Sequence, residues 1–102
     1  MRESQTLVSL SSAILDGIQQ VFTRFKPDIV LVQGDTTTAT IAGLAAFYSG
    51  IKVHHVEAGL RSFNKGMPEE TNRILTDHVS TWLFCPTEIG VSNLQKEGFH
   101  LN

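Results

Sequence analysis

The chain has 102 residues, of which 41% are hydrophobic and 18% charged, a composition typical of a folded domain rather than a disordered segment. Its net charge of -2 gives no electrostatic reason to expect nucleic acid or an anionic membrane as a partner, and no apolar run is long enough to span a bilayer. Cys85 is the single cysteine, so no internal disulfide can form, and the N-terminus lacks a secretory apolar region, which together predict a cytoplasmic location.

The first half of the chain alternates between helical and strand patterns. Apolar residues recur at three- and four-residue steps over 4–25 and predict a helix that ends before Pro27. The run Ile29–Val32 has no polar alternation and predicts a strand covered on both faces. An alanine-rich helix packed against the sheet is expected over 38–49, with Gly50 as its stop, followed by a strand over 52–56.

The second half continues the alternation. Pro68 predicts a helix over 69–80, whose apolar side would be Ile74, Leu75 and Val79. A short strand over 82–85 and a helix from Thr87 to Gly98, burying Ile89, Val91 and Leu94, complete the pattern. The order α-β-α-β-α-β-α predicts right-handed crossovers and a parallel sheet. Since no strand precedes the first helix, we expect the segment to be part of a larger domain.

Asp35 directly follows the first predicted strand, at the edge where open α/β folds bind ligands. Either Asp35 or one of the threonines after it caps the next helix, and this structural role is as well supported as a functional one. The three hydroxyls of Thr36, Thr37 and Thr38 favour a phosphate or sugar site slightly. No Gly-Lys-Ser/Thr follows, which disfavours hydrolysis of a nucleoside triphosphate.

Glu57 occupies the equivalent place after the second strand. It is either paired with Arg61 as structure or held for proton transfer, and the residues alone favour neither. His55 and Glu57 would share one face of the strand, while His54 points to the other. A metal site would need Asp35 as a further ligand, so a neutral His55 hydrogen-bonded to the backbone is the preferred interpretation, with no metal expected.

A third acidic group heads the helix after Pro68. Stabilising the helix dipole is a sufficient explanation for one of Glu69 and Glu70, and an intrahelical ion pair of these acids with Arg73 is the alternative. Pro68 fixes the approach of the loop and thereby the direction of Glu69. Three carboxylates on separate loops at one sheet edge suit acid/base chemistry at carbon, because crowding of like charges separates their pKa values.

Four motifs occur in the order and spacing of one family: Gly34-Asp35-Thr36-Thr37-Thr38, His55-Val56-Glu57-Ala58-Gly59-Leu60-Arg61, Pro68-Glu69-Glu70-x-Asn72-Arg73 and Pro86-Thr87-Glu88. Over residues 26–98 the chain resembles the non-hydrolysing UDP-N-acetylglucosamine 2-epimerases. The hydrolysing branch has other residues at Thr36 and Ala58, so these two positions favour the non-hydrolysing branch.

The resemblance implies a Rossmann-like parallel sheet with flanking helices, forming part of the N-terminal domain of a glycosyltransferase-B-like two-domain fold. Residues 1–102 would be a partial N-terminal domain without the C-terminal domain that grips UDP and contributes a catalytic histidine. The resemblance also implies interconversion of UDP-GlcNAc and UDP-ManNAc by elimination and re-addition of UDP. It further implies a UDP-sugar as substrate, no cofactor, and a homo-oligomer, which in the full-length family is a dimer.

Carried over by motif position, the resemblance implies three catalytic acids, Asp35, Glu57 and Glu69. Glu57 and Glu69 are the candidates for proton transfer at C2, and Asp35 is a third acid/base or orients a hydroxyl. The implied substrate-binding residues are Gly34, Thr36, Thr37, His55, Arg61, Glu70 and Arg73, the last two by holding the helix and loop in place.

The loop Ser62–Met67 is shorter than in many bacterial members, so allosteric binding of UDP-GlcNAc is not carried over and the sugar is left open to diacetamido relatives. At this length we expect the chain to be inactive alone. The alternatives are a non-catalytic nucleotide-sugar-binding or assembly remnant, an epimerase acting on a diacetamido UDP-sugar, and, less favoured, a glycosyltransferase of the same architecture.

Overall fold

The computed structural model describes residues 6–100 as four helices alternating with three strands. The elements are α1 (Leu7–Arg24), β1 (Ile29–Gln33), α2 (Thr37–Tyr48), β2 (Lys52–Val56), α3 (Pro68–Val79), β3 (Trp82–Phe84) and α4 (Glu88–Lys96). All three strands are parallel, in the order β1-β2-β3. This confirms the predicted order and the parallel sheet, with most boundaries shifted by a residue or two; residues 4 and 5 of the first predicted helix lie outside the described part.

The helix starts follow from local sequence signals. Thr36 accepts a hydrogen bond from the backbone N–H of Ala39 at 3.1 Å, so it is this threonine and not Asp35 that caps α2. Thr6 and Thr87 cap α1 and α4 in the same way, and Pro68 is the first residue of α3. None of the helices in residues 6–100 is long and apolar enough to cross a membrane.

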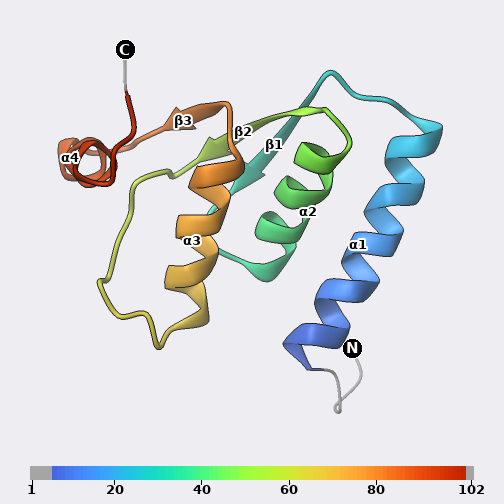
Figure 1. Ribbon diagram of the computed structural model, residues 1–102, viewed down its shortest axis with the longest axis horizontal. Coiled ribbons are helices and arrows are strands. Elements are labelled where there is room, and N and C mark those ends of the chain that lie inside the picture. The colour runs from blue at the N-terminus through green and yellow to red at the C-terminus, as the bar shows by residue number, and fades with distance from the viewer. Residues whose placement is uncertain (1–5, 101–102) are drawn as a thin grey trace.

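Helices α1, α2 and α3 lie side by side (Figure 1), with α2 in the middle; α2 and α3 pack on the sheet, and α1 packs on α2. The small side chains of α2 allow close approach on all sides and confirm its predicted packing against the sheet. The apolar core gathers between α1, α2 and the first two strands, from Phe22, Val32, Ala39, Ala42, Ala45, Ala46 and Val53.

The opposite face of the sheet is uncovered in the described residues, which corrects the prediction that the first strand is covered on both faces. Leu31 and Trp82 are 67% and 58% exposed, and Ile29 and Phe84 are about half exposed. The cause is topological: with the order β1-β2-β3, right-handed crossovers place α2 and α3 on the same face. His54 lies on the uncovered face between the rings of Trp82 and Phe84, pointing away from His55 as predicted.

The predicted apolar sides of the last two helices are partly wrong. Leu94 is buried as expected, but Ile89 is 74% and Leu75 50% exposed. Helix α3 instead buries a polar side, made of Glu70, Thr76 and Asp77. The reason is that its neighbours also present polar groups there, since Thr76 hydrogen-bonds Thr40 of α2 at 2.8 Å.

Candidate active site

Three acid-bearing segments meet at the carboxyl end of the sheet. They are the turn after β1, the loop after β2 and the first turn of α3. Figure 1 shows the first turns of α2 and α3 beside each other, with the loop from β2 leading into the start of α3. The side-chain amide of Asn72 in α3 donates to the backbone carbonyl of Asp35 at 3.0 Å, which joins the first segment to the third.

Asp35 is held by a guanidinium. Nε and Nη2 of Arg73 donate to its Oδ2 at 3.1 and 2.9 Å, and the Asp35 side chain is 34% exposed. Burial alone would lower the pKa of Arg73, but its hydrogen bonds to Asp35 and Glu70 outweigh burial and raise it. Asp35 therefore faces a permanent positive charge while part of its carboxylate stays accessible.

Glu57 lies in the turn that follows β2, outside the strand. Strand β2 ends at Val56, and Glu57 has φ 71°, a left-handed conformation that costs free energy for a side-chain-bearing residue. Its Oε1 accepts a hydrogen bond from the side-chain amide of Gln33, at the end of β1, at 2.8 Å. The expectation that His55 and Glu57 share a strand face is thus wrong, because the turn rotates Glu57 out of the strand's alternation.

Glu69 and Glu70 lie in different environments although they are adjacent. Glu69 is exposed at the start of α3. Glu70 is buried, and its carboxylate accepts from the backbone N–H groups of Ser62 and Phe63 at 3.0 and 2.8 Å and pairs with Arg73 at 2.9 Å. Burial alone would raise the pKa of Glu70, but these donors outweigh it and lower the pKa. The predicted ion pair of Arg73 with the adjacent acids is confirmed, the structure identifies Glu70 as the acid within the helix that forms it, and Glu70 fixes the loop to the helix.

A buried polar network lies beneath these segments, centred on Asp77 of α3, which is fully buried. Its Oδ1 lies 2.5 Å from Nδ1 of His55, and its Oδ2 accepts from the backbone N–H of Gly59 at 3.2 Å and lies 2.9 Å from Nη2 of Arg61. Arg61 also forms a two-pronged pair with Glu97 just after α4, at 2.7 and 2.8 Å.

Arg61 and His55, two of the predicted substrate-binding residues, find their hydrogen-bond partners within this network. Arg61 pairs with Asp77 and Glu97, which corrects the alternative that it pairs with Glu57. Burial alone would lower the pKa of Arg61, but its two acidic partners outweigh it and raise the pKa. His55 donates through Nε2 to the carbonyl of Gly34 at 2.8 Å, because a carbonyl can only accept. The predicted backbone bond of His55 is confirmed, and its Asp77 partner is an addition.

Sequence reasoning missed Asp77, Glu97 and Gln33. Asp77 carried a usable signal, since an acid in the last turn of a helix opposes the helix dipole and needs a compensating partner. Gln33 and Glu97 carry no such signal, because their partners are 24 and 36 positions away. The thiol of Cys85 is partly buried, and burial together with the charge of Asp77 raises its pKa.

The remaining predicted substrate ligands lie in the turn after β1. Gly34 has φ 78°, a conformation that glycine adopts without strain, and its carbonyl receives the bond from His55. Thr36 is the cap of α2 and Thr37 its first residue. The turn therefore presents the amino end of a helix, where unpaired N–H groups favour negative charge, at the same edge as the acids.

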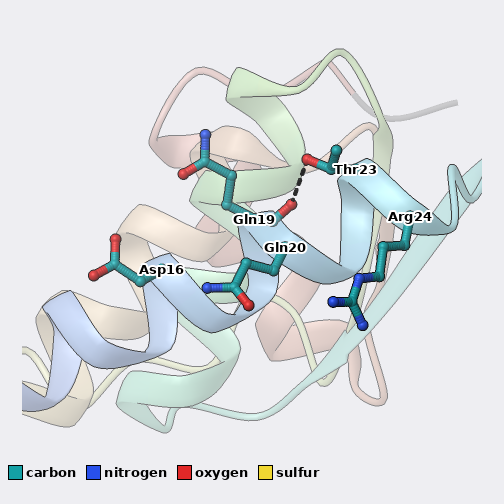
Figure 2. A pocket seen from close by; sticks show the side chains of 5 residues that line it. All are labelled: Asp16, Gln19, Gln20, Thr23 and Arg24. Atoms are coloured by element: carbon teal, nitrogen blue, oxygen red, sulfur yellow. Dashed lines mark hydrogen bonds between the residues drawn. The ribbon is translucent and has the colours of Figure 1, made fainter.

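Two hollows on the surface lie away from the acids. One is a shallow depression on α1 alone, lined by Asp16, Gln19, Gln20, Thr23 and Arg24 (Figure 2). The other lies between the end of α1 and the amino ends of β1 and β2, where Lys26, Asp28 and Ile51 line it. The acids therefore stand on an open edge that does not overlap either hollow.

Comparisons of the chain with known proteins all lead to one family. The family model described as UDP-N-acetylglucosamine 2-epimerase matches residues 1–102. A UDP-N-acetylglucosamine 2-epimerase from Methanococcus maripaludis is 58% identical over 79% of the chain, and a UDP-2,3-diacetamido-2,3-dideoxy-D-glucuronate 2-epimerase from Pseudomonas aeruginosa is 50% identical over 88%. The crystal structure of the Methanocaldococcus jannaschii UDP-GlcNAc 2-epimerase in complex with UDP-GlcNAc and UDP superimposes with a TM-score of 0.93 and 50% identity over 95% of the chain.

The chain spans about a quarter of the length of these relatives, 22%, 25% and 27% respectively. The match of the family model over the whole chain, the relatives at 50% identity or more and the shared fold lead to one conclusion. The chain belongs to the UDP-N-acetylglucosamine 2-epimerase family.

Proposed function

We propose that this chain supplies the catalytic carboxylates of an enzyme that interconverts UDP-GlcNAc and UDP-ManNAc. The observation that carries the proposal is the placement of Asp35, Glu57 and Glu69 on three segments that are tied together at the carboxyl edge of one sheet. Acidic groups on separate segments can act on opposite faces of one sugar carbon, as inversion at C2 requires.

The proposed reaction eliminates UDP and adds it back. A carboxylate removes the proton from C2, the C–H electron pair forms the C1–C2 double bond, and the C1–O bond breaks with its electrons leaving on UDP. In the second half of the reaction, a phosphate oxygen of UDP attacks C1 of the double bond, and a carboxylic acid delivers a proton to the other face of C2. No net oxidation occurs, so the step needs no redox partner.

The surroundings of the three acids support different roles. Glu57 is held by the neutral amide of Gln33 and Glu69 is exposed at a helix start, so either can exchange a proton with a substrate. Asp35 is paired with Arg73 through Oδ2 alone, which suits it to accept a hydrogen bond from a sugar hydroxyl through Oδ1. Thr36 and Thr37 stand at the start of α2, where helix-terminal N–H groups can face the substrate, and Gly34 shapes the turn that precedes them.

A chimera tests the proposal in a complete enzyme. Residues 6–100 of this chain replace the matching segment of the Methanocaldococcus jannaschii epimerase, whose fold they share. In D₂O, turnover of UDP-GlcNAc would place deuterium at C2 of both sugars, which proton NMR measures directly. A folded chimera that binds UDP but neither epimerises the sugar nor exchanges the C2 proton would overturn the proposal. The 102-residue chain alone is the parallel sample, and we expect it to be inactive.

A second substrate merits the same assay, because the Pseudomonas aeruginosa relative is named for a diacetamido uronate. Running UDP-GlcNAc and UDP-2,3-diacetamido-2,3-dideoxy-D-glucuronate in parallel on the chimera compares their kcat/KM values. A larger value for the diacetamido sugar would reassign the substrate while leaving the reaction type and the three acids in place.

A further inference from the structure

We infer that Asp77 is a positioning residue that sets the mutual geometry of the three acid-bearing segments, an inference that rests on the proposed function. Asp77 is fully buried and does not reach the open edge itself. One carboxylate oxygen contacts His55 of β2, which in turn bonds to the Asp35 turn, the other oxygen contacts the loop after β2 at Gly59, and its own helix carries the third acid.

The first connection runs through His55 to Asp35. Asp77 Oδ1 meets Nδ1 of the His55 ring, and the opposite nitrogen donates to the Gly34 carbonyl at 2.8 Å. A histidine bonded at both nitrogens has no freedom to rotate, so it acts as a rigid link. Gly34 directly precedes Asp35. The Asp35 turn is therefore joined to α3 twice, through His55 and Asp77 and through the ion pair of Asp35 with Arg73. This Asp–His pair cannot serve as a base, because both ring nitrogens are engaged and His55 is fully buried.

The second connection runs through Gly59 to Glu57. Asp77 Oδ2 accepts the Gly59 backbone N–H at 3.2 Å, two residues after Glu57. Gly59 has φ 84°, and a Cβ there would lie 2.5 Å from the carbonyl oxygen of Gly90 in α4, so only glycine fits here and the turn packs directly against the α4 backbone. The left-handed Glu57 thus belongs to a turn held on one side by Asp77 and on the other by α4.

The third acid shares the helix. Glu69 begins α3 and Asp77 lies two turns further along, so the helix fixes their separation. One buried carboxylate therefore joins the Asp35 turn, the Glu57 turn and the Glu69 helix. Because misplacing a reacting group by about 1 Å can lower a rate about 100-fold, loosening this anchor affects the chemical step more than binding of the nucleotide.

The test compares Asp77→Ala with Asp77→Asn. In the asparagine variant the amide oxygen can accept from Gly59 and Arg61 while its NH₂ group donates to Nδ1 of a neutral His55, so all three contacts can persist. In the chimera we expect Asp77→Ala to lower kcat about 100-fold at little-changed KM, and Asp77→Asn to retain most of the wild-type kcat. Rates are divided by the folded fraction measured by circular dichroism under assay conditions.

The matched control is Phe22→Leu, a core truncation in α1 that lowers stability without contacting any of the three segments. We expect it to keep the wild-type kcat per folded molecule even where its melting temperature falls as far as that of Asp77→Ala. If Asp77→Ala does not fold, Asp77→Ser replaces it under the same criteria. An alanine or serine variant with wild-type kcat per folded molecule would overturn the inference, as would an equal loss in Phe22→Leu.

Amide NMR of the 102-residue chain decides the point independently of turnover. Removal of the Asp77 carboxylate is expected to shift the backbone amides of Gly34, Asp35, Glu57 and Gly59 together, and asparagine is expected to keep them near their original positions. Unmoved amides in either turn would overturn the inference. If the wild-type chimera does not turn over, the proposed function fails, and these shifts alone support or overturn the role of Asp77.

Discussion

The two ends of the helical layer bury different kinds of side chain. Between α1 and α2 the interior is apolar and made of small residues around Phe22, Val32 and Val53. Around α3 it is polar: the buried His55 and Asp77 meet between this helix and β2, the buried Thr76 faces α2, and the buried Glu70 faces the loop after β2. The apolar end provides free energy of folding without directing any group at the site. The polar end fixes loops, since a buried hydrogen bond or ion pair specifies geometry in a way that apolar contact does not.

Glu57→Gln in the chimera should have the largest effect on turnover, without the loss of stability expected for a change at the apolar end. The amide keeps the shape and can still bond to Gln33, but it cannot exchange a proton with C2. We expect turnover to fall about 10²–10⁴-fold, the range that general acid–base catalysis contributes, with UDP affinity unchanged. Epimerisation rates and titration calorimetry with UDP measure both. Unchanged turnover would remove Glu57 from the mechanism.

Phe22→Ala should produce the opposite result at the apolar end. Phe22 is 8% exposed in the core, and truncating a buried phenylalanine typically costs about 3–5 kcal/mol of unfolding free energy. Urea unfolding of the chimera measures the loss. Turnover per folded molecule should stay at the wild-type value, because Phe22 touches none of the acid-bearing segments. A fall in that corrected rate would show that the apolar end also directs the site.

Glu70→Gln should show the pH dependence of the polar end. The pKa of Glu70 is lowered in the folded state, so its stabilisation is fully present above the unfolded value of about 4.3 and is lost as pH falls through the lowered folded value. We expect the variant to be about 1–3 kcal/mol less stable between pH 5 and 7, since glutamine leaves buried donors poorly paired. The difference should narrow below about pH 4. Urea unfolding across pH measures it; a pH-independent difference would contradict the assignment.

The same division explains which features could be predicted from the sequence. Periodicity, caps and Pro68 were sufficient for the seven elements and the parallel sheet, because those signals lie within a few residues of what they determine. The motif positions predicted that the Asp35 and Glu57 segments would share an edge with α3. The inward face of α3 was not predicted, since an apolar stripe was expected at Ile74 and Leu75 while the buried side is polar.

The site contacts that were not predicted are pairs of residues far apart in the sequence. The place of Asp77 in the last turn of α3 indicates that it needs a partner, but not that the partners are His55 and Gly59, which lie 22 and 18 positions away. Likewise, Arg61 had a nearby candidate partner in Glu57, but the turn sends them apart and Arg61 pairs with Asp77 and Glu97. Sequence spacing predicts neighbours on one element well. It does not predict which charges meet across elements.

Gln33→Met gives the smallest effect and the sharpest separation of stability from turnover. Gln33 is exposed, so the variant should change unfolding free energy by no more than about 0.5 kcal/mol. It removes the hydrogen bond to Glu57, and with such a bond worth about 0.5–1.5 kcal/mol, turnover in the chimera should fall roughly two- to tenfold. Leu31→Met on the same strand and face contacts no acid and should leave the rate unchanged. Equal rates in the two variants would mean that the strained turn alone holds Glu57. A loss confined to Gln33→Met would show that a surface side chain at the carboxyl end of β1 directs the chemistry without stabilising the fold.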